Sequence, residues 1–231
     1  MESFERVFQP PFEEVFQKDY RLKGLWKGAV FGNDHPLTLE LGCGKGEYTV
    51  GLARMYPERN FMGLDIKGAR IWSGAREARD ANLGNVAFLR TRIDFISSFF
   101  SREEVDELWI TFPDPQEKKR RRKKRLTGAL FLNRYREILR DMGQVSLKTD
   151  NLKLYRYTLE LVRYNGLEAV LHSEDVYATG WTNEVTSIQT YYESSFLDEG
   201  IPIKYISFRL PAGKKIRELP AGTEDRIYGE G

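Results

Sequence analysis

The chain has 231 residues and a formal net charge of only +2, and it is long enough for one domain with a full hydrophobic core. No apolar run approaches the roughly 18 residues of a membrane-spanning helix, the acidic start MESFERVFQP is unlike a signal peptide, and the single cysteine excludes an intramolecular disulfide. Two histidines provide no clustered zinc-ligand pattern, so we expect a cytoplasmic protein without a metal or a membrane segment.

Residues 1–34 carry aromatic, basic and turn residues without a sustained period, which predicts an irregular N-terminal arm partly packed on the domain. Its aromatic side chains have two interpretations, stacking on bases or apolar anchoring of a terminal segment, and anchoring is favoured. The domain itself is expected to span 35–210. Residues 211–231, rich in glycine, proline, lysine and glutamate, predict a loosely held polar tail.

From residue 37 onward, strand-like and helix-like patterns alternate along the chain. This predicts an α/β fold with a seven-stranded, mostly parallel sheet and helices on both faces. The expected strands are 37–42, 60–66, 85–91, 106–112, 143–149, 166–173 and 202–209. The expected helices are 46–56, 68–82, 94–101, 128–141, 151–165 and 186–199.

The stretch from Leu39 to Glu47 predicts a strand, a glycine turn and a helix. Gly42, Gly44 and Gly46 let the backbone turn and let a ligand approach with no Cβ in the way, which suits a nucleotide-like cofactor. Cys43 lies in the same turn. We interpret it as a small side chain that fits there, because no nearby histidine activates it as a nucleophile.

Two carboxylates accompany this turn. Asp65 ends the second expected strand about 20 residues later, where an acceptor for ribose hydroxyls belongs. NAD-binding proteins favour G-x-G-x-x-G, whereas this chain has G-x-G-x-G preceded by Glu40. The pattern resembles the first motif of class I S-adenosylmethionine (SAM) methyltransferases. The alternative is an ordinary glycine-rich turn, and the pairing of Glu40 with Asp65 argues against it.

Further carboxylates follow the third and fourth strands. Asp94 has two interpretations, an adenine-side contact and a helix N-cap, and both can hold at once. Asp114 lies between Pro113 and Pro115, directly after the fourth strand. Because ligands bind at the carboxyl ends of parallel strands, we favour a substrate-facing Asp114 over a plain turn residue.

Eight consecutive cations, Lys118 to Arg125, come next, although the rest of the chain is net acidic. Such runs are commonly solvated faces, and composition alone also allows a nuclear-localisation signal. This run, however, is internal and lies beside the expected active site. We therefore favour a role in binding a polyanion, and nucleic acid is the most obvious polyanion.

Two later segments also reach the expected crevice. Asp150 ends the fifth strand and either caps the next helix or touches the substrate. Thr190 and Glu193 lie at positions i and i+3 of Thr190-Tyr191-Tyr192-Glu193, and by pattern alone they predict a helix capping box and nothing more.

Taken together, these motifs resemble the bacterial tRNA (guanine-N7-)-methyltransferase family, TrmB, in one register over roughly residues 37–209. The motifs are Glu40-Leu41-Gly42-Cys43-Gly44-Lys45-Gly46, Gly63-Leu64-Asp65, Phe112-Pro113-Asp114-Pro115 with the cations after it, Lys148-Thr149-Asp150, and Thr190-Tyr191-Tyr192-Glu193 with Gly200-Ile201-Pro202-Ile203.

The resemblance implies a Rossmann-like SAM methyltransferase that modifies N7 of a variable-loop guanosine in tRNA, as a monomer or a homodimer. It implies that the SAM side is lined by Glu40, the motif glycines, Asp65, Asp94 and Asp114. It implies that the tRNA side is lined by Lys118, Asp150, Thr190, Tyr191, Tyr192 and Glu193. Asp114 is the implied catalytic residue.

The chain departs from the family pattern in two places. Gln116-Glu117 stands where the family often has tryptophan, and the basic segment lacks the usual histidine. Two alternatives stay open at this point: a SAM methyltransferase acting on another RNA base or amine, and a tRNA-binding protein without catalytic activity.

Overall fold

The computed structural model describes residues 4–228. Within them, one eight-stranded sheet has the strand order β1-β4-β3-β2-β5-β6-β8-β7. The strands are β1 (Val7–Phe8), β2 (Leu37–Leu41), β3 (Asn60–Asp65), β4 (Val86–Arg90), β5 (Val105–Thr111), β6 (Leu139–Thr149), β7 (Ala169–Ser173) and β8 (Lys204–Leu210). The seven expected strands are β2 to β8, so the predicted α/β sheet is confirmed.

The strand count was wrong by one, because the N-terminal arm adds β1. Val7 and Phe8 pair in parallel with Phe88 and Leu89 of β4. The strands from β1 to β6 all run parallel, whereas β8 is antiparallel to both β6 and β7. The carboxyl ends of β2 to β6 therefore meet along one edge of the sheet, which is where ligands bind in such folds.

The α-helices are α1 (Glu47–Met55), α2 (Gly68–Asp80), α3 (Ile96–Phe99), α4 (Ala129–Tyr135), α5 (Leu152–Tyr164), α6 (Glu184–Ser187), α7 (Tyr191–Asp198) and α8 (Thr223–Ile227). A π-helix spans Trp26–Phe31, and 3-10 helices span Phe12–Glu14, Ile93–Phe95 and Lys119–Lys124 (η4). Across residues 4–228, every helix is too short or too polar to traverse a lipid bilayer.

Three expected helices were too long. The helix expected at 186–199 is divided into α6 and α7, because Thr190 starts a new helix as its N-cap. The helix expected at 128–141 ends at Tyr135, because the chain enters β6 at Leu139. The helix expected at 94–101 is a 3-10 turn followed by the single turn of α3.

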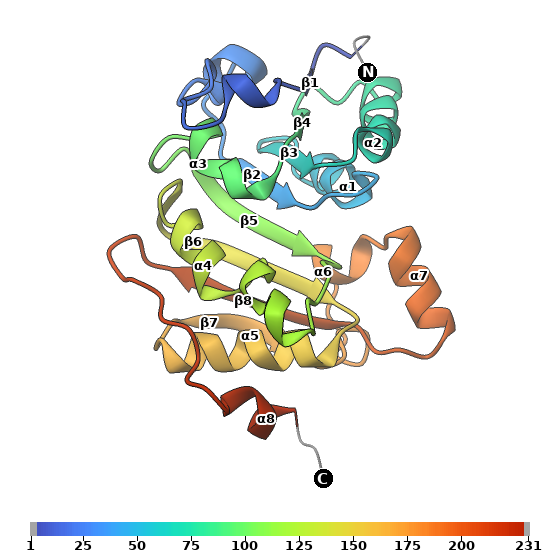
Figure 1. Cartoon of the computed structure of the whole chain (residues 1–231). Coiled ribbons are helices and arrows are strands. Elements are labelled where there is room, and N and C mark those ends of the chain that lie inside the picture. The colour runs from blue at the N-terminus through green and yellow to red at the C-terminus, as the bar shows by residue number, and fades with distance from the viewer. Residues whose placement is uncertain (1–3, 229–231) are drawn as a thin grey trace.

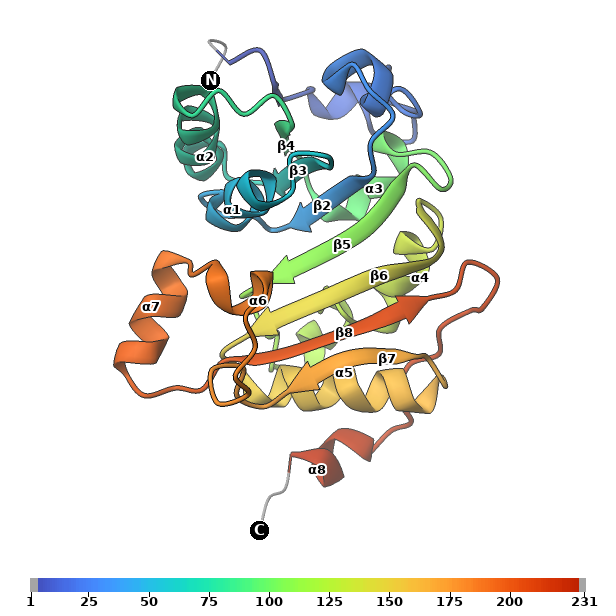
Figure 2. The ribbon, with the colours of Figure 1, turned by 180° about the vertical axis from the view of Figure 1, so that it is seen from behind.

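Helices cover both faces of the sheet, as Figures 1 and 2 show from opposite sides: α3, α4 and α5 on one face, and α1, α2 and α6 on the other. Alternate residues of each strand enter two separate cores. Leu39 and Ile110 belong to the core under α4 and α5, whereas Trp109 belongs to the core with Tyr48 of α1. Both faces are thus apolar, as a central parallel sheet requires.

The N-terminal arm is anchored by apolar side chains. Trp26 is fully buried, and its indole N–H donates to the Phe99 carbonyl at 2.7 Å. Tyr20 stacks on it with ring centroids 5.9 Å apart. The favoured interpretation, anchoring rather than base stacking, is confirmed for these two residues. Phe12 and Phe16 are exposed and stack on each other instead.

Part of the C-terminal segment, expected to be a loosely held polar tail, packs on the domain. Ile216 is only 2% exposed, and Thr223 and Glu224 of α8 are buried. Figure 1 shows α8 beyond α5, at the margin of the fold. The segment is polar in composition but makes specific side-chain contacts that its composition does not reveal.

Candidate functional site

The glycine turn between β2 and α1 is closed by backbone hydrogen bonds. The amides of Gly42 and Cys43 donate to the Leu64 carbonyl at 2.8 and 2.9 Å. Gly42 and Gly44 have φ values of 80° and 56°, and a Cβ built at either one meets nothing within 4 Å. The backbone there is open to a ligand, as predicted.

Gly46 serves a different purpose. A Cβ at this position would come within 2.6 Å of the Phe88 ring and 3.2 Å of the Gly74 Cα. Its missing side chain therefore lets α1 start close to α2 and β4. Cys43 is buried, and burial raises the pKa of its thiol well above the usual value, which agrees with a packing role.

Asp65 ends β3 and completes the turn. Its Oδ2 accepts from the Gly44 amide at 3.0 Å, and its Oδ1 accepts from the Lys67 amide at 2.7 Å. The residue is only 8% exposed. The carboxylate that sequence analysis placed at the cofactor is thus held rigidly against the glycine turn.

A cavity of about 350 Å³ opens beside this carboxylate. It is lined by Gly42, Asp65, Ile66, Thr91, Arg92, Ile93, Asp94, Lys124, Leu126 and Phe131. Residues from the ends of β2, β3 and β4 therefore share one space. The volume suits a small nucleoside, and the lining combines apolar side chains with two carboxylates, Asp65 and Asp94, and two cations, Arg92 and Lys124.

Asp94 lines the cavity and does not cap a helix, so its N-cap interpretation is wrong. Its Oδ1 accepts from Arg134 at 3.0 Å, and its Oδ2 accepts from Arg92 at 3.2 Å. Burial alone would raise the pKa of Asp94, but the hydrogen bonds and charges of the two arginines outweigh it, and the pKa is lowered. The carboxylate therefore stays ionised at the rim of the cavity.

Glu40 is buried on the other side of the turn. Its Oε2 accepts from both the amide and the hydroxyl of Thr49, and its Oε1 accepts from the Thr111 hydroxyl at 2.5 Å. Burial raises the pKa of Glu40 to about 7, although these hydrogen bonds oppose the rise. Glu40 thereby joins α1 and the end of β5 to the glycine turn.

These residues fit S-adenosylmethionine. The backbone at Gly42 and Gly44 is uncovered, since a Cβ at either position meets nothing within 4 Å, and Asp65 offers an acceptor next to Gly44. Asp94 faces the same cavity. Within residues 4–228, no three histidine, cysteine, aspartate or glutamate side chains cluster as a metal site would require.

Asp114 lies on the loop that follows β5. This loop starts where the Phe112 amide donates to the Lys148 carbonyl at 2.8 Å. Asp114 is exposed, and its Oδ1 accepts from the Gln116 amide at 2.9 Å. Phe112 and Gln116 have φ values of 46° and 50°, which are uncommon for residues other than glycine. The loop therefore holds one carboxylate outward with a strained backbone at both ends.

Asp150 follows the next strand, β6, and it does not cap α5. The N-cap is Asn151, whose side chain accepts from the Leu154 amide at 2.8 Å. The Asp150 carbonyl accepts from Lys204 Nζ at 3.0 Å. Burial raises the pKa of Asp150, while the charge of Lys204 works against the rise. Its half-buried carboxylate lies at the same edge as Asp114.

The predicted capping box of Thr190 and Glu193 is confirmed at the start of α7. Glu193, however, is fully buried and accepts from Lys148 and Tyr177, so it does not face solvent. Tyr191 and Tyr192 are 64% and 45% exposed, with their rings in an edge-to-face arrangement. Of these four predicted substrate residues, only the two tyrosines have exposed side chains.

Tyr191 also touches the glycine turn. Its amide donates to Glu47 Oε1 at 3.1 Å, and Lys45 Nζ lies 4.8 Å from the centre of its ring. The glycine turn and the start of α1 are thus in direct contact with the start of α7. The structure brings together two segments that the sequence separates by 144 residues.

The basic run forms the 3-10 helix η4. Lys118, Arg120, Arg121, Lys123 and Lys124 are exposed, as a polyanion clamp needs. Arg122 is half-buried and Arg125 is only 2% exposed, because both contact Glu224. These two arginines therefore differ from the exposed cations of the run, because their guanidinium groups pair with a carboxylate of the protein itself.

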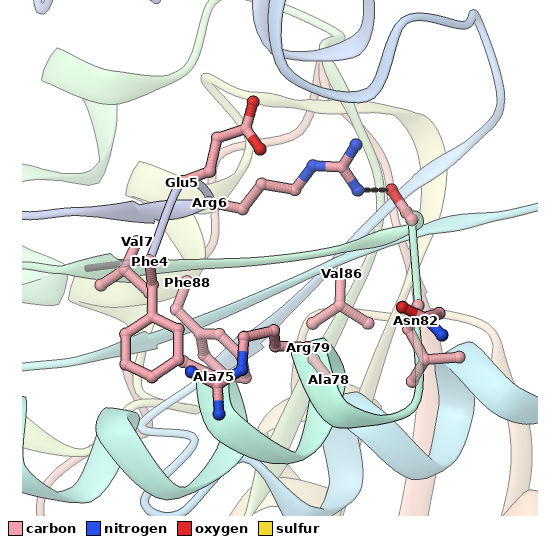
Figure 3. Close-up of a pocket in the computed structure, with 12 residues that line it drawn as sticks. Phe4, Glu5, Arg6, Val7, Ala75, Ala78, Arg79, Asn82, Val86 and Phe88 are labelled. Carbon is pink, nitrogen blue, oxygen red and sulfur yellow. Dashed lines mark hydrogen bonds between the residues drawn. The ribbon is translucent and has the colours of Figure 1, made fainter.

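A second cavity, of about 400 Å³, lies between β1 and α2. Figure 3 shows Phe4, Arg79 and Phe88 at its wall, with Arg6 donating to the Gly84 carbonyl. None of the residues that sequence analysis assigned to the site lines it. The cavity at the carboxyl edge is lined by three of the residues predicted at the cofactor, Gly42, Asp65 and Asp94. The other predicted cofactor residues, Glu40, Gly44, Gly46 and Asp114, are not part of its lining.

Sequence reasoning missed several supporting residues. Thr49 and Thr111 hold Glu40, and Lys148 and Tyr177 hold Glu193. The position of Lys148 could have indicated its role, since a lysine inside a central strand needs a buried partner of opposite charge. The two threonines could not have been identified from the sequence, because hydroxyl side chains are common in strands and helices alike.

Comparison with known proteins agrees with this geometry. Residues 34–206 match a family described as "Putative methyltransferase". The chain is 48% identical to the tRNA (guanine-N(7)-)-methyltransferase of Bacteroides thetaiotaomicron, over 94% of this chain and 86% of that one. It is 52% identical to the enzyme of the same name from Porphyromonas gingivalis, over 91% of this chain and 86% of that one.

A solved structure supports the fold alone. The 16S rRNA methyltransferase KamB superposes with a TM-score of 0.56 at 16% identity, covering 76% of this chain and 88% of that chain. The family resemblance that the motifs indicated is confirmed by the relatives at 48% and 52% identity.

Proposed function

Since the chain belongs to the tRNA (guanine-N(7)-)-methyltransferase family, we propose that it methylates N7 of a variable-loop guanosine in tRNA, with SAM as the cofactor. Bound SAM supplies the electrophilic methyl group. We infer a cytoplasmic enzyme from its tRNA substrate. The observation that carries the proposal is Asp114, an exposed carboxylate on the constrained loop that joins β5 to the basic helix η4.

Guanine N7 carries a lone pair and no proton, so its attack on a methyl group needs no general base. The chain's own residues then act mainly by holding the guanine in line with the methyl group. Such positioning is worth up to roughly 7–11 kcal/mol in favourable cases. The site accordingly needs acceptors that grip the base rather than a residue that removes a proton.

Asp114 is the proposed catalytic residue. Its Oδ1 accepts from the Gln116 amide, and its side chain is exposed. The exposed carboxylate can accept from the N1 and N2 donors of guanine and so orient the ring. The carboxylate also offsets the positive charge that develops on the methylated purine.

The remaining site residues divide into two groups. Asp150, Tyr191 and Tyr192 are proposed to contact the RNA, the tyrosines by stacking. Glu193 and Thr190 are proposed to position these tyrosines rather than to touch the substrate. Lys118 and the other exposed cations of the run are proposed to bind phosphates.

The test measures transfer of labelled methyl from SAM to matched tRNA transcripts that carry guanosine or 7-deazaguanosine at the variable-loop site. Label on the first transcript only is expected. Equal labelling of both would mean that another base or an amine is the target. SAM and tRNA binding without any labelling would indicate a binding protein that lacks catalysis.

Asp114→Asn tests the catalytic assignment. We expect turnover to fall roughly 100-fold while the Kd for SAM stays unchanged. Asp34→Asn is the matched control, since Asp34 is exposed and precedes β2 at the opposite edge of the sheet. Wild-type turnover in Asp114→Asn would remove Asp114 from this role.

A further inference from the structure

The last arginine of the basic run faces the C-terminal segment instead of solvent. Arg125 Nη1 donates to Glu224 Oε2 at 2.9 Å, and Nη2 donates to the Tyr228 hydroxyl at 3.2 Å. Arg122 Nη1 lies 3.2 Å from the other oxygen, Glu224 Oε1. One carboxylate from α8 therefore engages two arginines, and Tyr228 donates to it as well.

The same guanidinium reaches the loop that carries Asp114. Arg125 Nε donates to the Pro115 carbonyl at 3.2 Å. The guanidinium carbon lies 4.3 Å from the centre of the Tyr157 ring, and the Tyr157 hydroxyl donates to Glu218 at 2.7 Å. Arg125 is thus held by Tyr157 of α5, by Glu224 and Tyr228 of the C-terminal segment, and by the carbonyl of Pro115, the residue that follows Asp114.

The loop needs such support. Phe112 and Gln116 hold left-handed backbone torsions, which side chains other than glycine disfavour. Asp114 itself is exposed, and its intramolecular hydrogen bond is local, to the Gln116 amide. Contacts from outside the loop therefore decide whether the carboxylate keeps its orientation.

We infer that Glu224 is a positioning residue of the active site, acting through Arg125 on the Pro115 carbonyl and so on Asp114. The inference rests on the proposed function, because the position of Asp114 matters only if that residue meets guanine. The cations of the basic run then fall into two groups with different roles. Arg122 and Arg125 belong to the support of the loop, and the exposed cations of η4 remain for phosphates.

The experiment compares Glu224→Gln and Tyr228→Phe with a control, Glu58→Gln. Glu58 is an exposed carboxylate that precedes β3, at the opposite edge of the sheet. The measurements are kcat for methyl transfer to tRNA, the Kd for SAM, and the salt dependence of tRNA binding. Thermal unfolding of each variant is followed with and without SAM.

For Glu224→Gln we expect kcat to fall about tenfold or more, since small displacements of a positioned group have effects of that size. The Kd for SAM and the salt dependence of tRNA binding should stay at the control values. Tyr228→Phe removes one of the hydrogen bonds to the carboxylate and keeps its charge, so a smaller loss of kcat is expected.

Two results would overturn the inference. One is a kcat for Glu224→Gln equal to that of the control. The other is tighter tRNA binding with a steeper salt dependence, which would mean that Glu224 withholds the two arginines from RNA phosphates. If Glu224→Gln fails to fold, an undiminished kcat in Tyr228→Phe overturns it. Inactive wild-type protein would instead contradict the proposed function.

Discussion

Lys148 and Glu193 form an ion pair that is closed to solvent on all sides. Nζ lies 2.7 Å from Oε1, and neither side chain has any exposed surface. Lys148 also donates to the Ile188 carbonyl, and Tyr177 donates to Glu193. The pair connects the end of β6 to α7, and it thereby fixes the position of the helix that carries the exposed Tyr191 and Tyr192.

Breaking this pair should be costly, because one charge would stay buried without its partner. We expect Glu193→Gln and Lys148→Met each to lower the free energy of unfolding by about 3–5 kcal/mol. Combining the two should cost less than the sum of both, since neither buried charge then remains. Denaturant unfolding of the four proteins in a double-mutant cycle measures this coupling.

The control for this cycle is the exposed pair Arg54 and Glu77, which joins α1 to α2 at 2.9 Å. Its coupling should stay below about 1 kcal/mol. Equal coupling energies for the two pairs would mean that burial adds nothing to the interaction of Lys148 with Glu193. Both single variants of the buried pair should also raise the KM for tRNA, because α7 loses its anchor.

The cofactor half of the site was predictable because it is local. Glu40 and the glycines fall within one strand, turn and helix, and Asp65 ends the adjacent strand β3. The alternation of strands and helices places the carboxyl ends of β2 to β6 at one edge. Nothing beyond strand order was needed to bring these groups together.

The substrate half was predicted less well, because distant residues decide which side chains stay exposed. Glu193 is buried by Lys148, 45 residues away, and Arg125 by Glu224, 99 residues away. A run of cations gives no sign that one member is buried until its partner is known. For the same reason, the polar composition of the C-terminal segment does not show that Ile216 and Glu224 are buried.

Gly44 and Gly46 should respond differently to alanine. A Cβ on Gly44 meets nothing in the protein but enters the space open to the cofactor, so Gly44→Ala should weaken SAM binding more than it lowers stability. A Cβ on Gly46 collides with Phe88, so Gly46→Ala should lower the free energy of unfolding by about 1–3 kcal/mol. Calorimetric SAM titration and denaturant unfolding separate the two effects.

Gly32→Ala controls for backbone strain, since Gly32 also has a positive φ, 69°, and a Cβ there meets nothing within 4 Å. It lies before β2, at the opposite edge of the sheet from the cavity. Similar losses of SAM affinity in Gly32→Ala and Gly44→Ala would show that strain, rather than intrusion on the ligand, causes the loss.

The exposed cations of η4 should control the salt dependence of tRNA binding. Replacing Arg120 and Arg121 by glutamine should reduce the slope of log K against log salt by up to about 2, with kcat at saturating tRNA retained. Fluorescence titrations over a range of salt concentrations measure the slope. The control replaces Arg102 and Lys215, exposed cations outside the run. An unchanged slope in the first variant would exclude these arginines from phosphate binding.

The buried carboxyl group of Glu40 should make stability depend on pH. Its pKa rises from 4.5 to about 7 on folding, because burial disfavours the charged form, so the folded state binds the proton more tightly than the unfolded state. This contribution to stability is complete below pH 4.5 and is lost as the pH rises through about 7. The shift corresponds to roughly 3 kcal/mol.

The free energy of unfolding of the wild type, measured between pH 5 and 8 relative to that of Glu40→Gln, should therefore decrease with rising pH. A constant difference between the two proteins would mean that Glu40 titrates alike in the folded and unfolded chains, and that Thr49 and Thr111 stabilise its charge fully.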